Sequence, residues 1–261
     1  MYYYLYDAFL SDPKYEKIVD KIRTRLLDLE IQGKPGHLSL LKSANELIED
    51  EVKNGINTVV VVGNDKTFLK VINVIAKNEL TLGIIPIGEN NEIAQYLGIP
   101  PEELACDVVA ARKVEKVDLG MANDVYFFSN MRVDKDVSRI NIKKDKFQII
   151  PQQNCQSVLI YNFCYSSGNI GNHKILNKIN PQDKLLDLAV IETGRFSGGF
   201  LKKKKNNSRY GKTLLQAPEF EINSFEYLPV KLDNSYVLKT PVKAKVIKDK
   251  LKLIVGKHRK F

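Results

Sequence analysis

The stretch at residues 58–75 most narrows the folds open to this chain. Four consecutive valines at 59–62 have β-branched side chains, which suit a strand buried on both faces. Gly63 interrupts the run, and apolar residues then recur with helical spacing at 68–75. The stretch therefore predicts a buried strand, a tight turn and a helix, as in a parallel α/β sheet.

The predicted turn carries polar side chains at the start of its helix, namely Asn64, Asp65 and Thr67. Backbone N–H groups at a helix start form a natural phosphate site. Asn and Asp are also preferred helix N-caps, so a cap without any ligand is an equally good interpretation of this stretch alone.

A second strand and turn follow fewer than 30 residues later. Residues 82–86 predict a short buried strand, residues 88–92 a polar turn and residues 93–97 the start of a helix. Both turns should lie at the carboxyl edge of one parallel sheet, where open α/β sheets bind ligands.

The flanking segments fit the same α/β pattern. Residues 2–6 predict a strand, Asp12 with Pro13 opens a helix, and Ser43 with Glu46 forms a capping box at the next helix. Residues 33–36 contain two glycines and a proline and predict a loop. A further helix should run from residue 100 to about residue 112.

After residue 113 the sequence changes to short apolar runs separated by turns, which indicates a mostly β domain. The fold class expected is an N-terminal parallel α/β domain followed by a β-sandwich domain. The expected boundaries are residues 1–118 for the α/β nucleotide-binding domain, 119–255 for the β-sandwich substrate domain and 256–261 for a basic tail.

Composition excludes several classes of protein. Three cysteines without C-x-x-C spacing and three scattered histidines argue against a disulfide framework or a zinc site. The N-terminus lacks the pattern of a signal peptide, and no apolar run is long enough to span a membrane. We therefore expect a cytoplasmic protein, with peripheral membrane association as an open alternative.

The charge is divided unevenly along the chain. Residues 1–120 contain 14 Lys and Arg against 19 Asp and Glu, a net −5, whereas residues 121–261 contain 26 against 12, a net +14. The densest basic cluster consists of Lys202, Lys203, Lys204, Lys205 and Arg209. It predicts either a dock for anionic lipid headgroups or a solvated loop. Few aromatic residues accompany it, so we expect no nucleic-acid partner.

The order of the motifs resembles the diacylglycerol kinase catalytic family, which includes bacterial lipid kinases and sphingosine kinases. That family's G-G-D-G-T turn corresponds to GNDKT at residues 63–67, and its P-x-G-T-x-N-D turn to PIGENNE at residues 86–92. The family's L-G-I-P, D-L-G and P-x-x-D-G-x-L-D patterns correspond to residues 97–100, 118–120 and 181–187. The first turn is shared with NAD kinases, whereas the second turn and L-G-I-P favour the lipid-kinase branch.

The resemblance implies ATP and Mg²⁺ as cofactors and a lipid or small-molecule hydroxyl as acceptor. The residues that it implies to be catalytic are Asp65, Glu92 and Asp118, with Asp65 and Asp183 as metal ligands. Nucleotide binding is implied for Gly63, Asn64, Lys66, Thr67, Gly88 and Asn91. A homodimer is a further possibility, since relatives are often dimers.

The chain departs from the family at several positions. Lys66 replaces a glycine, which would cost about 1 kcal/mol if its backbone were left-handed, although its ammonium could instead reach a phosphate. Glu89 replaces a threonine, and its carboxylate at about 5 Å from a phosphate would cost on the order of 3 kcal/mol. Ser235 aligns with the position of the family's general base, unless a loop shift brings Glu226 there.

Two functions therefore remain open from the sequence. The chain is either an active kinase that transfers the γ-phosphoryl group of ATP to a lipid or other hydroxyl, or a catalytically impaired, pseudokinase-like protein that binds a nucleotide or lipid without turnover. An NAD kinase is the weaker third alternative.

Overall fold

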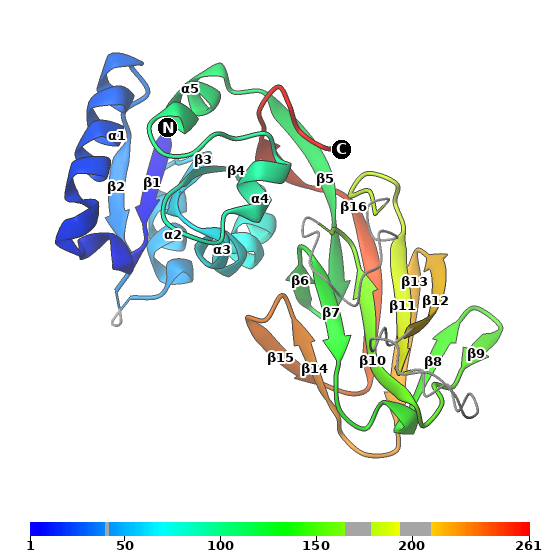
Figure 1. The fold of residues 1–261 in the computed structure, drawn as a ribbon. Coiled ribbons are helices and arrows are strands. Elements are labelled where there is room, and N and C mark those ends of the chain that lie inside the picture. The colour runs from blue at the N-terminus through cyan, green and yellow to red at the C-terminus, as the bar shows by residue number, and fades with distance from the viewer. Residues whose placement is uncertain (40–41, 165–178, 194–209) are drawn as a thin grey trace, which may run out of the picture. The chain divides into compact units, whose positions relative to one another are not determined.

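The chain folds into two compact units in the computed structural model, which describes residues 1–39, 42–164, 179–193 and 210–261 (Figure 1). Unit 1 comprises Met1–Leu119 and Lys248–Phe261, and unit 2 comprises Gly120–Ile247. From the sequence alone, residues 119–255 are expected in the second domain and residues 256–261 in a basic tail. In the structure the chain from Lys248 onward lies in unit 1, because Lys252 and Leu253 pair with a strand of that unit.

Unit 1 is built from parallel strands connected by helices. Its strands are β1 (Tyr2–Tyr6), β2 (Lys34–His37), β3 (Thr58–Gly63), β4 (Thr81–Pro86) and parts of β5 (Val114–Ala122) and β16 (Val242–Ile254). Its helices are α1 (Glu16–Asp28), α2 (Ala44–Lys53), α3 (Asp65–Lys77), α4 (Glu92–Tyr96) and α5 (Leu104–Ala111), with 3-10 turns at Ala8–Ser11 and Pro13–Tyr15.

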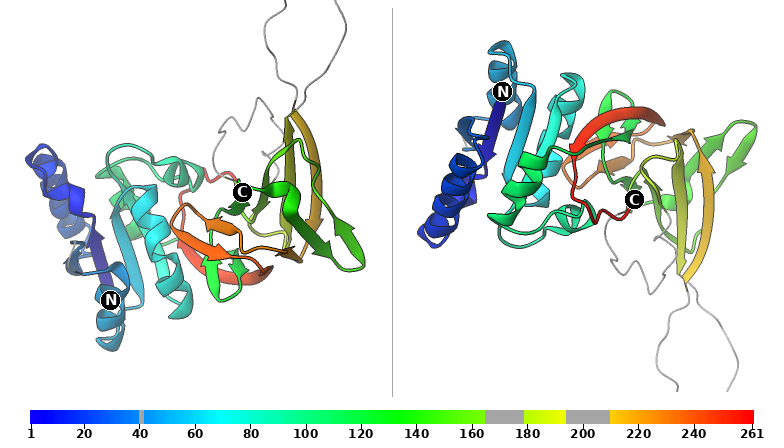
Figure 2. Two further views of the ribbon diagram at one scale, coloured as in Figure 1. Left: turned by 90° about the horizontal axis from the view of Figure 1, so that it is seen from below. Right: turned by 90° about the horizontal axis from the view of Figure 1, so that it is seen from above.

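The sheet of unit 1 has the strand order β2-β1-β3-β4-β16, and these neighbours pair in parallel. The chain moves outward from β1 to β2 and then back across β1 to β3, so right-handed crossovers place helices on both faces. Helix α1 contacts α5, and α2 contacts α3, as this arrangement requires. Figure 2 shows the same sheet from two further directions. The four valines of β3 are fully buried, as their β-branched run predicts.

Strand β2 was not predicted, because Gly33, Pro35 and Gly36 resemble a loop. The structure gives these glycines a packing role: a Cβ on Gly36 would lie 1.9 Å from the hydroxyl oxygen of Tyr3. Pro35 is tolerated because β2 is the edge strand of the sheet. The expectation of a loop at residues 33–36 was therefore wrong.

Unit 2 is antiparallel. Its strands are β6 (Val125–Phe127), β7 (Asn130–Val133), β8 (Ile140–Lys144), β9 (Phe147–Ile149), β10 (Cys155–Tyr161), β11 (Leu186–Thr193), β12 (Tyr210–Ala217), β13 (Glu219–Ser224), β14 (Pro229–Leu232) and β15 (Tyr236–Lys239), with a 3-10 turn at Val137–Arg139. One sheet has the order β12-β11-β10-β7-β14-β15, and a second group has the order β16-β13-β8-β9.

Both groups of strands contribute to one apolar core in unit 2. Met131 and Ile160 come from the first sheet, Ile142 and Phe220 come from the second group, and all four are at most 1% exposed. In the part of the chain that the structure describes, no helix is long and apolar enough to cross a bilayer.

Gly120 in β5 provides a test of this packing. A Cβ at this position would lie 2.0 Å from the ring of its strand partner Phe127, which is fully buried. We expect Gly120→Ala to lower the free energy of unfolding by about 1–3 kcal/mol, as overpacking does. Urea denaturation measures the loss.

The double variant Gly120→Ala with Phe127→Leu should recover part of that loss, because the smaller side chain leaves room for the methyl group. Gly83→Ala is the control, since its Cβ meets no atom closer than 3.3 Å. An equal loss at Gly83 and Gly120, without recovery in the double variant, would contradict this account.

Candidate functional site

The first polar turn, residues 63–67, joins the end of β3 to the start of α3. Asn64 is the N-cap of α3, and its side-chain oxygen accepts the N–H of Lys66 at 3.1 Å. The capping role that the sequence suggested for this turn is therefore present. It leaves the carboxyl end of β3 and the N-terminus of α3 at one edge of the sheet, where a ligand site is expected in such folds.

The second polar turn, residues 86–92, lies beside the first. Gly88 has a φ of +76°, a left-handed conformation that favours glycine. The side-chain amide of Asn91 donates to the carbonyl oxygen of Gly88 at 2.8 Å, so this turn is stabilised from within. The Ile87 N–H donates to the Gly63 carbonyl oxygen at 2.8 Å, which connects the second turn to the first.

Asp65 makes the main connection between the two turns. Its backbone N–H donates to the carbonyl oxygen of Asn90 at 3.1 Å. Its carboxylate accepts the backbone N–H of Glu92 at 2.8 Å and that of Ile93 at 3.2 Å, at the start of α4. The backbone N–H and the side-chain carboxylate of Asp65 therefore both hold the second turn against the start of α3.

The Asp65 carboxyl is buried, with 7% of the residue exposed. Burial raises its pKa from 3.8 to about 6, and the N–H bonds from Ile93 and Glu92 act in the opposite direction. The removal of the carboxylate from water therefore outweighs the hydrogen bonds that it accepts.

The departures from the family motif can now be placed. Lys66 lies in the first turn of α3, so it does not pay the cost of a left-handed backbone that a glycine position can impose. Asn64 is extended, with φ −124° and ψ −175°. Glu89 is exposed and lines an open cavity of about 580 Å³ beside both turns.

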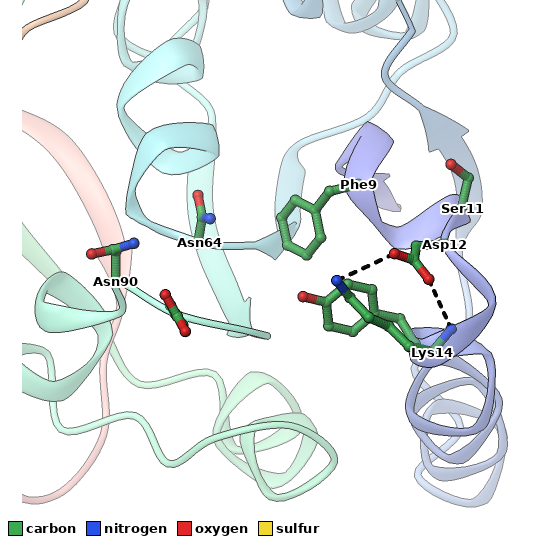
Figure 3. A pocket seen from close by; sticks show the side chains of 8 residues that line it. Phe9, Ser11, Asp12, Lys14, Asn64 and Asn90 are labelled. Carbon is green, nitrogen blue, oxygen red and sulfur yellow. Dashed lines mark hydrogen bonds and ion pairs between the residues drawn. The ribbon is translucent and has the colours of Figure 1, made fainter.

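The cavity has two unlike walls (Figure 3). Asn64, Glu89 and Asn90 come from the two turns, whereas the opposite wall comes from the two 3-10 turns after β1. On that wall the rings of Phe9 and Tyr15 meet edge to face with centroids 5.2 Å apart. The remaining lining residues of the opposite wall are Ser11, Asp12 and Lys14, and Lys14 forms an ion pair with Asp12 at 3.2 Å.

Asp7 is a site residue that the sequence analysis missed. It follows β1 directly, its carboxylate accepts the Phe9 N–H at 3.2 Å, and it also accepts the hydroxyl of Thr67. The fully buried Thr67 is thus oriented by a neighbouring strand. The sequence could have indicated Asp7, because it directly follows a predicted strand, and β1 ends at the same sheet edge as β3.

Of the other two acidic residues predicted to be catalytic in unit 1, Glu92 is exposed and Asp118 is buried. Glu92 is exposed at the first position of α4. Asp118 is 2% exposed and accepts the backbone N–H of Asp249 at 2.8 Å, at a residue with φ +51°. Asp118 therefore stabilises the chain where β16 has a left-handed residue.

Two further predicted residues lie in unit 2. The Asp183 carboxylate accepts the N–H of Leu185 at 3.0 Å, and the adjacent Lys184, at the family's glycine position, has a φ of +66°. Ser235 is exposed in the β14–β15 turn, where its N–H donates to the Leu232 carbonyl oxygen at 2.9 Å.

Asp233 dominates the β14–β15 turn, although the sequence analysis gave it no role. Its carboxylate accepts three backbone N–H groups, from Phe128 at 2.6 Å, Ser129 at 2.8 Å and Asn130 at 2.9 Å. The turn that carries Ser235 is thereby fixed to the segment between β6 and β7.

Glu226 does not approach the position of Ser235. It precedes β14, pairs with Arg139 at 2.8 Å, and its carbonyl oxygen accepts the Thr240 hydroxyl at 3.2 Å. Because Pro229 pairs with Lys239 and Leu232 with Tyr236, Glu226 and Ser235 lie at opposite ends of the β14–β15 hairpin. The alternative in which a loop shift brings Glu226 into the base position is therefore not supported. The basic cluster of Lys202, Lys203, Lys204, Lys205 and Arg209 lies outside the described residues.

The raised pKa of Asp65 predicts a pH dependence. Because its folded-state pKa lies above the ordinary value of 3.8, its contribution to stability is fully present below about pH 4 and is lost as pH rises through about 6. Relative to Asp65→Asn, the wild type should lose up to about 3 kcal/mol of unfolding free energy between those limits. Urea denaturation of both proteins from pH 4 to pH 7 measures it. A difference that stays flat or grows with pH would contradict the buried carboxylate.

Removal of the Asp233 carboxylate should be costly. Asp233→Ala leaves three buried N–H groups without their acceptor, and each such group costs about 1–3 kcal/mol. We expect a loss of at least about 3 kcal/mol in thermal or urea denaturation. Asp124→Ala, an exposed acidic residue of unit 2, is the matched control and should change stability by less than about 0.5 kcal/mol. Equal effects of the two substitutions would refute the role of Asp233.

Comparison with known proteins supports the resemblance noted in the sequence. Residues 11–122 match the model of the diacylglycerol kinase catalytic domain. A diacylglycerol kinase of Bacillus subtilis is 37% identical over 75 residues, and one of Mycobacterium tuberculosis is 31% identical over 109 residues. These alignments span 25% and 34% of the length of those relatives. A putative lipid kinase of Staphylococcus carnosus is 22% identical over 87% of this chain and 86% of its own.

Solved structures extend the likeness in fold to the whole chain. The crystal structure of a diacylglycerol kinase from Bacillus anthracis matches with a TM-score of 0.76 at 18% identity, covering 99% of this chain and 97% of that one. A putative diacylglycerol kinase from the same organism gives a TM-score of 0.77 at 16% identity. The resemblance predicted from the sequence is therefore confirmed: residues 11–122 match the model of the diacylglycerol kinase catalytic domain, and the chain is similar to bacterial diacylglycerol kinases and lipid kinases.

Proposed function

We propose that this protein is an ATP-dependent kinase that transfers the γ-phosphoryl group to a hydroxyl of a lipid or small molecule. The observation that carries the proposal is the connection through Asp65, which holds two polar turns and the N-terminus of α3 beside one cavity. Phosphoryl transfer depends mainly on positioning and charge neutralisation, and rigid turns of this kind supply the positioning.

The cavity is suited to a nucleotide. Its volume of about 580 Å³ lies in the usual range for small-molecule sites. The rings of Phe9 and Tyr15 offer an apolar surface for a base, and Gly88 lies against both rings. Asn64 and Asn90 offer polar groups on the facing wall.

Most of the polar residues and two glycines of the two turns receive a proposed role. The nucleotide-binding residues are Gly63, Asn64, Lys66, Thr67, Gly88 and Asn91. Lys66 is exposed at the start of α3, where its ammonium can approach a phosphate. Such an approach offsets the repulsion between phosphate and Glu89, which lines the same cavity. Asp65, Glu92 and Asp118 are proposed as the catalytic carboxylates.

The donor groups near the turns fit a Mg²⁺ ion that arrives with the nucleotide. Mg²⁺ binds through one or two carboxylates together with substrate phosphates and waters. Glu92 offers an exposed carboxylate, and the Oδ1 atom of Asn91 is buried without a partner among the described residues. The described residues contain no group of three or more His, Cys, Asp or Glu that could hold a metal alone. When bound, the ion would neutralise phosphate charge. Asp65 and Asp183 remain proposed metal ligands.

A second candidate function is binding of nucleotide or lipid without turnover. Ser235 favours it, since a serine without an adjacent base cannot abstract a proton at neutral pH. In this case the protein is a pseudokinase that retains the cavity and lacks the base. Phosphorylation of NAD is a weaker candidate, which an assay with NAD as acceptor tests.

Partners and location follow from the proposed activity. An acceptor lipid would bring the protein to a membrane surface, and the basic cluster at residues 202–209 is proposed to contact anionic headgroups there. We further propose a cytoplasmic location, no nucleic-acid partner and a homodimeric assembly.

Transfer of label from γ-labelled ATP tests the activity. With Mg²⁺ and vesicles that contain hydroxyl-bearing lipids, the wild type should label an acceptor, and Glu92→Gln should reduce the rate by about a hundredfold or more. Asp124→Ala should leave the rate unchanged. Saturable binding of Mg-ATP without label transfer to any acceptor would exclude the active kinase and establish the second candidate.

The variant Ser235→Glu tests whether the lack of a general base at residue 235 limits the rate of phosphoryl transfer. If the turn places residue 235 at the acceptor hydroxyl, a carboxylate there should raise the rate by at least about tenfold, within the range for general bases. Ser235→Gln, which has similar shape and no basic oxygen pair, is the control. An equal rate in both variants would show that residue 235 lies away from the reaction.

A further inference from the structure

The L-G-I-P pattern at residues 97–100 has no role in the site described so far. Its glycine, Gly98, has a φ of +72°, and a Cβ there would lie 2.5 Å from the backbone nitrogen of Arg259. The contact is reciprocal, since a Cβ on Gly256 would lie 1.8 Å from the carbonyl oxygen of Gly98. Both glycines are therefore required by the close approach of the last residues of the chain.

The C-terminal segment, residues 256–261, also satisfies the end of helix α4. The Gly256 N–H donates to the carbonyl oxygen of Leu97 at 2.9 Å, and the Lys260 N–H donates to that of Tyr96 at 2.9 Å. Carbonyl groups at a helix end have no partner within the helix, so these bonds fill that need.

Two side chains fix the C-terminal segment in place. Arg259 pairs with Glu115 at 2.6 Å, and the two side chains are only 23% and 25% exposed. The ring of Phe261 stacks on that of Tyr96, with centroids 6.0 Å apart and planes 9° apart, and the Arg259 guanidinium lies 6.0 Å from the Phe261 ring. The sequence predicted only a basic tail at residues 256–261, whereas in the structure these residues make specific contacts with unit 1.

Helix α4 depends on such contacts because it has only five residues. A helix this short is not stable in isolation. At its N-terminus the Glu92 and Ile93 N–H groups bind the Asp65 carboxylate, and at its C-terminus the carbonyl groups bind the C-terminal segment. The second turn leads directly into this helix.

We infer that the C-terminal segment positions α4 and, through it, the second turn of the nucleotide site, with Arg259 and Phe261 as positioning residues. This inference rests on the proposed nucleotide-binding function. It makes the last residues of the chain part of the determinants of nucleotide affinity, although they lie at the far end of α4 from the turn.

The test uses the full-length variants Arg259→Ala and Phe261→Ala, with Lys257→Ala as the control. Lys257 is an exposed lysine of the same segment, so its removal takes away the same charge as removal of Arg259. Amide hydrogen exchange reports the order of α4, and titration with Mg-ATP reports nucleotide affinity, at a temperature where each variant is fully folded.

We expect faster exchange at Ile93 and Leu97 by about tenfold in both positioning variants. The Kd for Mg-ATP should rise by about fivefold or more, a typical coupling between linked sites. Arg259→Lys should recover part of both effects, because it keeps the pair with Glu115. Lys257→Ala should match the wild type.

Three outcomes overturn the inference. Unchanged exchange in α4 shows that the segment does not order the helix, and faster exchange with an unchanged Kd shows that it orders the helix without affecting the site. An equal effect of Lys257→Ala would show that the loss of a positive charge, and not the loss of a specific contact, causes the changes. If the wild type binds no Mg-ATP, the proposed function fails and the positioning role with it, whereas the exchange data still decide whether the segment orders α4.

Discussion

The buried carboxylate of Asp65 lies where the two polar turns meet, and the geometry of the candidate site depends on it. It accepts N–H groups from the first residues of α4, while its own N–H binds the second turn. The burial that raises its pKa is the cost of this position, and the hydrogen bonds offset part of that cost. Apart from this connection, the bond from the Ile87 N–H to the Gly63 carbonyl oxygen also joins the second turn to the first.

A buried carboxylate that accepts backbone N–H groups also joins two segments in unit 2. The Asp233 carboxylate accepts three backbone N–H groups and fixes the turn that carries Ser235 to a separate segment of chain. In both units a buried acidic residue joins segments that are far apart in sequence. The motif glycines serve close approach in a similar way: Gly98 admits the C-terminal segment, and Gly120 admits the Phe127 ring. The patterns shared with kinases thus include residues that shape the backbone as well as residues that could touch a ligand.

Local patterns in the sequence were sufficient to predict the five helices of unit 1, most strands and the pairing of the two turns. The capping box at Ser43, for example, is a short-range signal and is present in the structure. Long-range contacts were less accessible. Neither the return of β16 to unit 1 nor the packing of Gly36 against Tyr3 is visible without the tertiary structure. Asp7, Asp233 and the C-terminal segment were missed for the same reason, because their partners lie about 60, 105 and 160 residues away.

The central claim is that the two turns joined by Asp65 form one phosphate-binding site for a nucleotide. Titration of the protein with a non-hydrolysable Mg-ATP analogue, followed through backbone amide resonances, tests it without any need for turnover. The account predicts saturable shifts centred on residues 63–68 and 87–93, together with residues around Phe9 and Tyr15. Saturable shifts confined to other regions, or no binding at millimolar nucleotide, would contradict it.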